Sequence, residues 1–202
     1  DTYAGIPMAI TAENLAEKYQ LTREQSDAFS LASQKKAADA QKAGRLAEEI
    51  VAIEITDKKG TRSFNQDEHL RPDTTPEILA KLKPVFKKDG VVTAGSASGI
   101  VDGAAMLCVA TESEAKRRGA TPLGRLVAYG VAGCDPKIMG IGPVPASKQA
   151  LERSGLKLDQ MDLVEVNEAF APQTLAVQKE LGIDPARLNV NGGAIAIGHP
   201  LA

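Results

Sequence analysis

Residues 189–200 read NVNGGAIAIGHP, and this stretch decides most of what the sequence indicates about the chain. Its paired glycines permit a tight backbone path, and the glycine and proline that flank His199 fix how the chain enters and leaves. The chain has only two histidines, and the other one, His69, lies in a polar loop. A lone histidine is more often structural than catalytic, but one held rigidly at the apex of a loop indicates a functional group.

A second stretch, VEVNEAFA at residues 164–171, places polar side chains between an apolar run and a helical pattern. We expect a strand to deliver Asn167 and Glu168 at its C-terminal end, just where a helix begins. In α/β proteins, ligands bind in the crevice at that end of the strands. Asn167 could equally be a helix N-cap, and the stretch by itself favours that simpler interpretation.

A third stretch, TAGSASG at residues 93–99, contains only small residues. Such a loop lets the backbone approach another group closely. The pattern alone leaves open whether this is a flexible turn or a loop that faces a ligand.

From residue 123 onward, strand and helix patterns alternate, which predicts helices layered over a sheet. The expected strands are 123–130, 163–166 and 188–191, and the expected helices are 145–154 and 170–181.

Earlier in the chain, residues 11–44 have helical patterns, with Thr11 expected to cap a first helix. Thr22 and Gln25 form a capping box for the second helix. A narrow apolar stripe, made by Ala28, Leu31, Ala32 and Ala38, predicts that this second helix lies on the surface.

Between these regions we expect a β-hairpin that turns at residues 57–60 and a short helix over 77–82. We expect a buried strand over 104–110, with Cys108 as one of its buried residues. Thr111 is expected to cap the helix that follows.

Composition excludes several classes of function. The formal net charge of −2 gives no electrostatic case for binding nucleic acid, and no apolar run approaches the roughly 18 residues of a membrane helix. Two cysteines are too few for a disulfide scaffold or a cysteine-rich metal site, so we expect reduced intracellular thiols and no metal. The first residue, Asp1, is not methionine, which suggests a processed or truncated chain.

The motif at 167–170, together with the motif at 191–200, resembles the paired signature of thiolases. Residues 93–99 and 102–105 are similar to the segment that precedes this signature in the family, and the similarity runs in order along all 202 residues. The resemblance implies an α/β, thiolase-like five-layer αβαβα fold, represented here by an incomplete portion. It assigns 1–94 to the remainder of the inserted CoA-covering region, 95–118 to the last strand and helix of the N-terminal half, and 119–202 to most of the C-terminal half.

The resemblance also implies an acyltransferase that condenses or thiolytically cleaves 3-ketoacyl-CoA through a cysteine acyl-enzyme. His199 matches the histidine that activates the cysteine and donates to the thioester oxygen, and Asn167 matches the residue that fixes a water in the oxyanion hole. Cys108 and Cys134 match neither family cysteine. We expect the nucleophile upstream of Asp1 and the acid/base cysteine beyond Ala202, so the 202-residue chain itself is expected to be inactive.

Coenzyme A or acyl-CoA is implied as the substrate, with no tightly bound cofactor. The matched CoA-binding positions are Ser98 and Ala94 at the pantetheine arm, Met8 and Phe170 at apolar walls, and Arg71 near the nucleotide end, where a guanidinium suits a phosphate. Without the family, Arg71 reads as a solvated loop arginine.

As partners, the resemblance implies acyl-CoA substrates and a homodimer or homotetramer, without nucleic acid or membrane. A cytoplasmic location is expected, or a mitochondrial or peroxisomal one in a eukaryote. One alternative is a non-catalytic thiolase-like protein that binds acyl-CoA or lipid, although intact Asn167 and His199 favour an enzyme. Decarboxylating condensing enzymes usually place a second histidine near 167–171, and this chain has none there.

Overall fold

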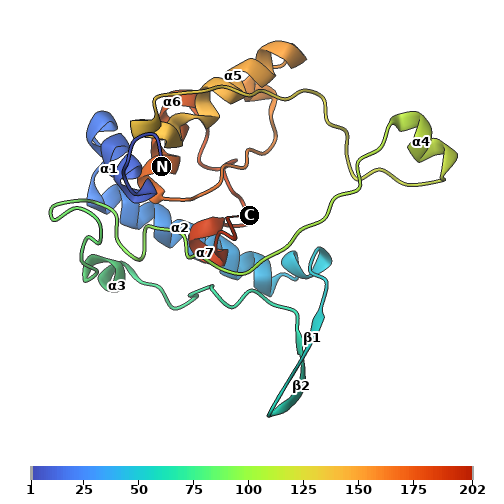
Figure 1. Ribbon diagram of the computed structural model, residues 1–202, viewed down its shortest axis with the longest axis horizontal. Coiled ribbons are helices and arrows are strands. Elements are labelled where there is room, and N and C mark those ends of the chain that lie inside the picture. Colours follow the sequence, from blue (N-terminus) through green and yellow to red (C-terminus); the bar gives the residue numbers. More distant parts are fainter. Residues whose placement is uncertain (1, 202) are drawn as a thin grey trace.

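The computed structural model describes residues 2–201, and most of its helices gather around two long N-terminal helices, whereas α4 (Glu112–Arg117) lies apart from them (Figure 1). Helix α1 (Met8–Tyr19) packs against the 3-10 helix η2 (Pro136–Ile141) and against α6 (Ala171–Leu181). Helix α2 (Arg23–Lys42) packs against α6 and against the short helix α7 (Ala194–Ile197). Segments from both ends of the sequence therefore form one body.

The start of α2 is as predicted, and the start of α1 is not. Thr22 Oγ1 accepts a hydrogen bond from the Gln25 backbone N–H, and the Thr22 N–H donates to Gln25 Oε1 over 2.9 Å. Helix α1 begins after Pro7, three residues before the predicted cap, and the Thr11 hydroxyl donates to the Met8 carbonyl over 2.6 Å inside the helix. A threonine hydroxyl can bond either way, so the residue type alone did not fix its position.

The buried face of α2 differs from the predicted apolar stripe. Ala28 and Ala32 are exposed, and the helix instead buries Ser26, Ser30, Ser33, Gln34, Ala37 and Ala40. Small side chains are needed there because Gly192 approaches so closely that an added Cβ would lie 2.6 Å from the Ser33 carbonyl oxygen. The helix therefore lies at the surface with one face against the body, and the prediction is wrong about which residues form that face.

The main apolar core lies between α1, α6 and α5 (Pro143–Ser154). Its buried members are Leu15, Ile141, Val144, Ala176, Val177, Ile183 and Leu188. A smaller apolar cluster joins Ala37 of α2 to Leu70 and Ala196.

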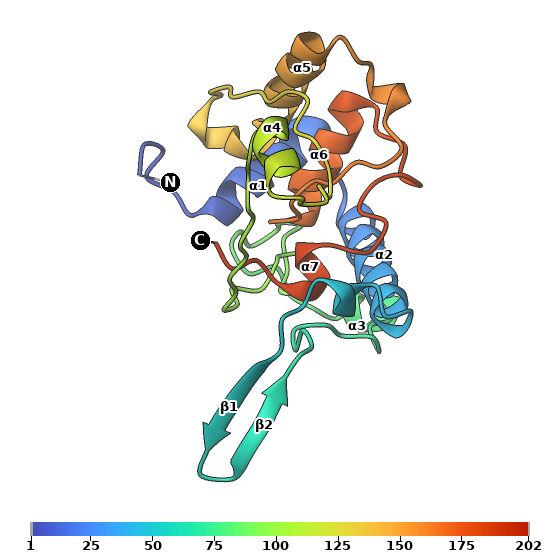
Figure 2. The same ribbon diagram turned by 90° about the vertical axis from the view of Figure 1, so that its right-hand side faces the viewer.

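The predicted hairpin is confirmed as an antiparallel pair, β1 (Ile53–Asp57) and β2 (Gly60–Phe64), that projects from the body (Figure 2). The short helix α3 (Pro76–Ala80) also agrees with expectation, as does α4 (Glu112–Arg117), whose cap Thr111 accepts from the Glu114 N–H. Helices α5 and α6 begin within two residues of their predicted starts.

Most of the predicted layer of strands is not formed. Residues 104–110 and 123–130 are extended chain with exposed side chains, and Cys108 is exposed, not buried. The strands expected at 163–166 and 188–191 are reduced to an isolated parallel bridge between Val164 and Leu188. A strand needs a neighbour to accept its backbone hydrogen bonds, and within residues 2–201 no bridge joins 104–110 or 123–130 to another segment. No helix among the described residues is both long and apolar enough to cross a membrane.

Candidate active site

Asn167 and His199 converge in the structure, although 32 positions separate them. Asn167 follows the bridge at Val164 and precedes α6, whereas His199 follows α7. The Asn167 Nδ2 atom lies 3.3 Å from His199 Nε2. Asn167 is exposed and His199 is half-buried, so a substrate can reach both side chains.

The His199 ring has a contact at each nitrogen. Besides the Asn167 contact at Nε2, the Leu201 backbone nitrogen lies 3.4 Å from Nδ1. A neutral imidazole has one N–H donor and one acceptor nitrogen. The Asn167 Nδ2 group can only donate and lies at the shorter of the two distances, so it favours the tautomer with a lone pair on Nε2, which can accept a proton beside Asn167.

The backbone of His199 is held by the small-residue loop at 93–99. The His199 N–H donates to the Gly99 carbonyl over 2.8 Å, and Ile100 forms a parallel bridge with His199. The side-chain position of His199 therefore depends on a segment about a hundred residues earlier in the sequence.

The same loop also lies against the segment that follows Asn167. The Ser98 N–H donates to the Ala169 carbonyl over 3.0 Å, and the Ala171 N–H donates to the Ser96 carbonyl over 2.8 Å. An isolated antiparallel bridge joins Ala97 to Phe170. Residues 93–99 thus connect the two motifs, and the alternative of an independent flexible turn is wrong.

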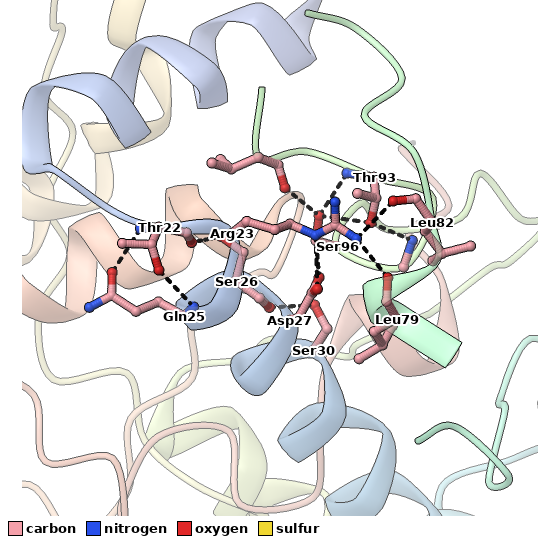
Figure 3. Close-up of polar contacts among 12 residues, drawn as sticks. Thr22, Arg23, Gln25, Ser26, Asp27, Ser30, Leu79, Leu82, Thr93 and Ser96 are labelled. Atoms are coloured by element: carbon pink, nitrogen blue, oxygen red, sulfur yellow. Dashed lines mark hydrogen bonds and ion pairs between the residues drawn. The ribbon is translucent and has the colours of Figure 1, made fainter. Parts of the chain in front are cut away.

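A polar cluster at the start of α2 holds the segment against which the loop at 93–99 packs (Figure 3). Arg23 forms an ion pair with Asp27 at 2.8 Å, and its Nη2 donates to the carbonyls of Leu79 and Leu82. The side chains of those two leucines pack so closely on Gly95 that an added Cβ would lie 2.5 and 2.8 Å from them. Arg23 therefore fixes the segment on which Gly95 rests.

Ser96 closes the loop on itself. Its Oγ accepts a hydrogen bond from the Thr93 N–H over 2.9 Å and donates to the Val91 carbonyl. The Gly95 N–H donates to Thr93 Oγ1 over 3.1 Å. Because both side chains are buried and bonded, the loop has a defined shape.

His69 belongs to this neighbourhood, which the sequence did not indicate. Its ring packs on Gly99 so closely that a Cβ there would overlap it. Burial, and secondarily the positive charge of Arg71, lower the pKa of His69 below its usual range. The contact joins residues thirty positions apart, and no local pattern signals it.

Of the predicted CoA-binding residues, Ser98 and Phe170 lie in segments that contact each other. Ala94 and Met8 are exposed, with Met8 at the start of α1. The Arg71 guanidinium is exposed, and its Nη1 donates to three carbonyls of its own loop, those of Glu68, His69 and Leu70. Their contact with CoA stays a prediction.

Both halves of the chain match known domains. Residues 1–113 match the family profile described as "Thiolase, N-terminal domain", and residues 120–202 match "Thiolase, C-terminal domain". The chain belongs to the thiolase family.

Two relatives illustrate how similar this thiolase chain is to others. It is 57% identical over 202 residues to the mitochondrial 3-ketoacyl-CoA thiolase of Bos taurus, covering all of this chain and 51% of that protein. It is 56% identical over 201 residues to an acetyl-CoA acetyltransferase of Rhizobium meliloti, again covering 51% of the relative. The chain therefore spans about half the length of these relatives.

A solved structure, human mitochondrial 3-ketoacyl-CoA thiolase in complex with CoA, superposes with a TM-score of 0.91 at 51% identity. The match covers 100% of this chain and 50% of the human chain. The prediction of a partial thiolase-like α/β fold is therefore confirmed, although few of its strands form in this portion.

The two cysteines of this thiolase chain lie outside the Asn167–His199 pair. Cys108 is exposed, and Cys134 Sγ lies 3.6 Å from the Met139 carbonyl oxygen beside η2. Within residues 2–201, no hydrogen bond joins either thiol to Asn167 or His199. The described site can polarise a carbonyl group, and a thiol nucleophile would have to come from elsewhere.

Proposed function

We propose that this chain contributes the histidine and asparagine of a thiolase active site, in an enzyme that condenses or thiolytically cleaves 3-ketoacyl-CoA. The contact between Asn167 and His199, within the two motifs that resemble the family signature, carries this proposal. It places two polar groups, at least one of them an N–H donor, beside one accessible point, as stabilisation of an oxyanion requires.

The nucleophile in this proposal is a cysteine outside residues 1–202, in what we call the complete protein. His199 Nε2 accepts the thiol proton, the thiolate attacks the thioester carbon, and the Nε2–H then donates toward the carbonyl oxygen. In the condensing direction the CoA sulfur departs with the proton from His199, which leaves an acyl-cysteine. In thiolysis the thiolate attacks the C3 carbonyl instead, the C2–C3 bond breaks, and C2 takes a proton as acetyl-CoA departs, which leaves the same acyl-cysteine. The Asn167 amide fixes a water that is the second donor to the oxygen.

For the CoA moiety, we infer a path along the loop at 93–99. The fixed backbone of Ser98 supports this path, with Ala94 on the exposed side of the same loop and Phe170 bridged to Ala97. We further propose that Met8 lines the thioester end and that the exposed Arg71 meets a phosphate. A relative solved in complex with CoA is consistent with acyl-CoA as the substrate class.

We also propose that residues 1–94 cover the CoA molecule and that the complete protein forms a homodimer or homotetramer. The compartment follows the host: cytoplasmic in a bacterium, and mitochondrial or peroxisomal in a eukaryote. The Bos taurus relative is named as a mitochondrial protein.

The test is a thiolysis assay with acetoacetyl-CoA and CoA on the complete protein. We expect Asn167→Ala to lower kcat by about 100- to 1,000-fold, as is typical for loss of one oxyanion donor. His199→Ala should abolish turnover with folding retained. Glu152→Ala, at an exposed position on α5, is the control and should keep full activity.

Two results would overturn the proposal. One is undiminished turnover in the His199 variant. The other is a complete protein that binds acyl-CoA but forms no acyl-cysteine detectable by mass spectrometry, which would make it a binding protein.

A further inference from the structure

We propose that Glu168 is a positioning residue that sets the separation between Asn167 and His199. This inference rests on the proposed function. Glu168 follows Asn167 directly in the sequence, but its side chain lies on the buried side and is only 1% exposed. It therefore cannot meet the substrate itself, and any effect it has must pass through its neighbours.

The Glu168 carboxylate is held by three donors from three parts of the chain. Oε2 accepts from Ser33 Oγ over 2.6 Å and from the Ile195 N–H over 3.2 Å. Oε1 accepts from Asn189 Nδ2 over 2.8 Å. All three partners donate hydrogen bonds, and an ionised carboxylate can accept all of them because it has only acceptor atoms.

No lysine or arginine of the described residues forms an ion pair with this carboxylate. Its buried charge is stabilised by hydrogen bonds alone, so each donor must be well placed. Such a group resists displacement, because moving it leaves buried polar atoms without partners.

Each donor belongs to a segment that carries one side of the site. Ile195 lies in α7, four residues before His199. Ser33 lies in the middle of α2, and its hydroxyl also accepts from the Gly193 N–H over 3.1 Å. The carboxylate and Ser33 together therefore fix both the start of α7 and the turn that leads to it.

Asn189 connects the same carboxylate to the segment before Asn167. Its Oδ1 accepts from the Val166 N–H and its Nδ2 donates to the Val166 carbonyl, both over 2.8 Å. Asn189 has a positive φ of 44°, a conformation that asparagine tolerates better than most residues. The side chain of Asn189 thus bonds to both the N–H and the carbonyl of Val166, as the backbone of a neighbouring strand would.

Gly193 shows how tightly the carboxylate is enclosed. A Cβ at Gly193 would overlap the carboxyl carbon of Glu168. The glycine pair of the NVNGGAIAIGHP motif is therefore explained by two close approaches, of Gly192 to α2 and of Gly193 to Glu168. The sequence indicated only that these glycines allow a tight path.

The test compares Glu168→Gln and Ser33→Ala with the unaltered complete protein in the thiolysis assay. In Glu168→Gln, an NH2 group must face a donor, either Asn189 Nδ2 or the pair at Ser33 and Ile195. A displacement approaching 1 Å at a catalytic group can lower the rate by about 100-fold. We expect Glu168→Gln to lower kcat by about 10- to 100-fold. It should leave KM within about twofold, because the Glu168 carboxylate bonds to none of the residues proposed to contact CoA.

Rates are expressed per active site, counted as the acyl-cysteine that forms in a single-turnover reaction and is measured by intact mass. A residue with a merely structural role would lower the number of sites but not the rate of each. Glu152→Gln, at an exposed carboxylate on α5, is the matched control and should change neither quantity.

Ser33→Ala keeps the carboxylate and removes one donor, so it tests the proposal even if Glu168→Gln does not fold. We expect a smaller fall in kcat per site, and a double variant whose loss is less than the product of the two single losses. Unchanged kcat per site in the folded variants would overturn the role of Glu168. Absence of thiolysis by the unaltered complete protein would instead overturn the proposed function.

Discussion

At the scale of single residues, ionisable groups near the site differ in their surroundings. Partial burial, and then the negative charge of Glu168, raise the pKa of Glu165 above its usual range, with Lys36 opposing. A carboxyl group whose pKa is raised on folding favours its neutral form. Its ionisation therefore weakens the fold above the unfolded pKa of 4.5, and that loss is complete above the folded pKa.

We expect Glu165→Gln to stabilise the protein at pH 7, because glutamine cannot ionise. The side chain is exposed enough for water to screen it, so the gain should stay below about 1 kcal/mol, or a rise in Tm of about 1 to 3 °C. Thermal denaturation at pH 7 and at pH 3.5 checks this, and the difference should vanish at the acidic pH. An equal shift at both values would show that charge is not the cause.

Through His69, a fall in pH should change the stability of the fold in the direction opposite to its effect through Glu165. Its pKa is lowered by burial and by Arg71, so its protonation opposes folding. The stability of the fold should fall as pH drops below the unfolded value of 6.5 and through the folded pKa.

His69→Gln should therefore lose less thermal stability than the unaltered protein between pH 7 and pH 5. Denaturation curves at both pH values for the two proteins give the comparison. Parallel losses would contradict the assigned burial of the ring against Gly99.

At the scale of helices and loops, some stabilising features lie within a few residues of one another and others join distant parts of the chain. The capping box of α2 lies within four residues, and it is a complete signal in itself. We expect Thr22→Ala to cost about 1 kcal/mol of unfolding free energy, measured by urea denaturation. Thr121→Ala, at an exposed position outside the helices, should be near neutral.

Gly193 makes the corresponding prediction for a loop. Gly193→Ala places a Cβ on the Glu168 carboxyl group and should cost about 1 to 3 kcal/mol, as overpacking does. Gly124→Ala is the matched control, because a Cβ there meets no atom within 4 Å. Urea midpoints that are equal for the two variants would show that the Glu168 enclosure is soft.

Sequence patterns could predict the capped helices α2 and α4 and the hairpin, since each is signalled within a dozen residues. The pairing of Asn167 with His199 came from the resemblance to thiolases, because the stretch around Asn167 by itself favours a helix N-cap. Sequence patterns could not predict the buried face of α2, because that face is set by the approach of Gly192 from a distant loop. The hydrogen bonds of Glu168 could not be predicted for the same reason, because Ser33 lies 135 positions away in the sequence. The unformed strands at 104–110 and 123–130 show that an apolar run specifies a strand only when a partner strand lies beside it.

At the scale of the whole molecule, an extended segment leads to and from α4 (Figure 1), and several of its apolar side chains are exposed. Met106 and Val109 are 93% and 87% exposed, and Leu123 and Val131 are also exposed. A soluble protein rarely presents so much contiguous apolar surface without a partner.

We therefore expect a polypeptide of residues 1–202 alone to bind the dye ANS and to self-associate in sedimentation experiments. Leu107→Ser with Val109→Ser should reduce both effects. A monomer that melts cooperatively and does not bind ANS would contradict this expectation.

One further consequence concerns the His199 backbone, which pairs with Gly99 and Ile100 across the boundary between the two domain profiles. The position of His199 in the candidate site therefore depends on residues of both domains. A chimera that joins the first domain of one homologue to the second domain of another would have to preserve these backbone contacts of His199. Recombination between diverged genes should thus survive best when its crossover carries residues 96–100 along with the C-terminal partner.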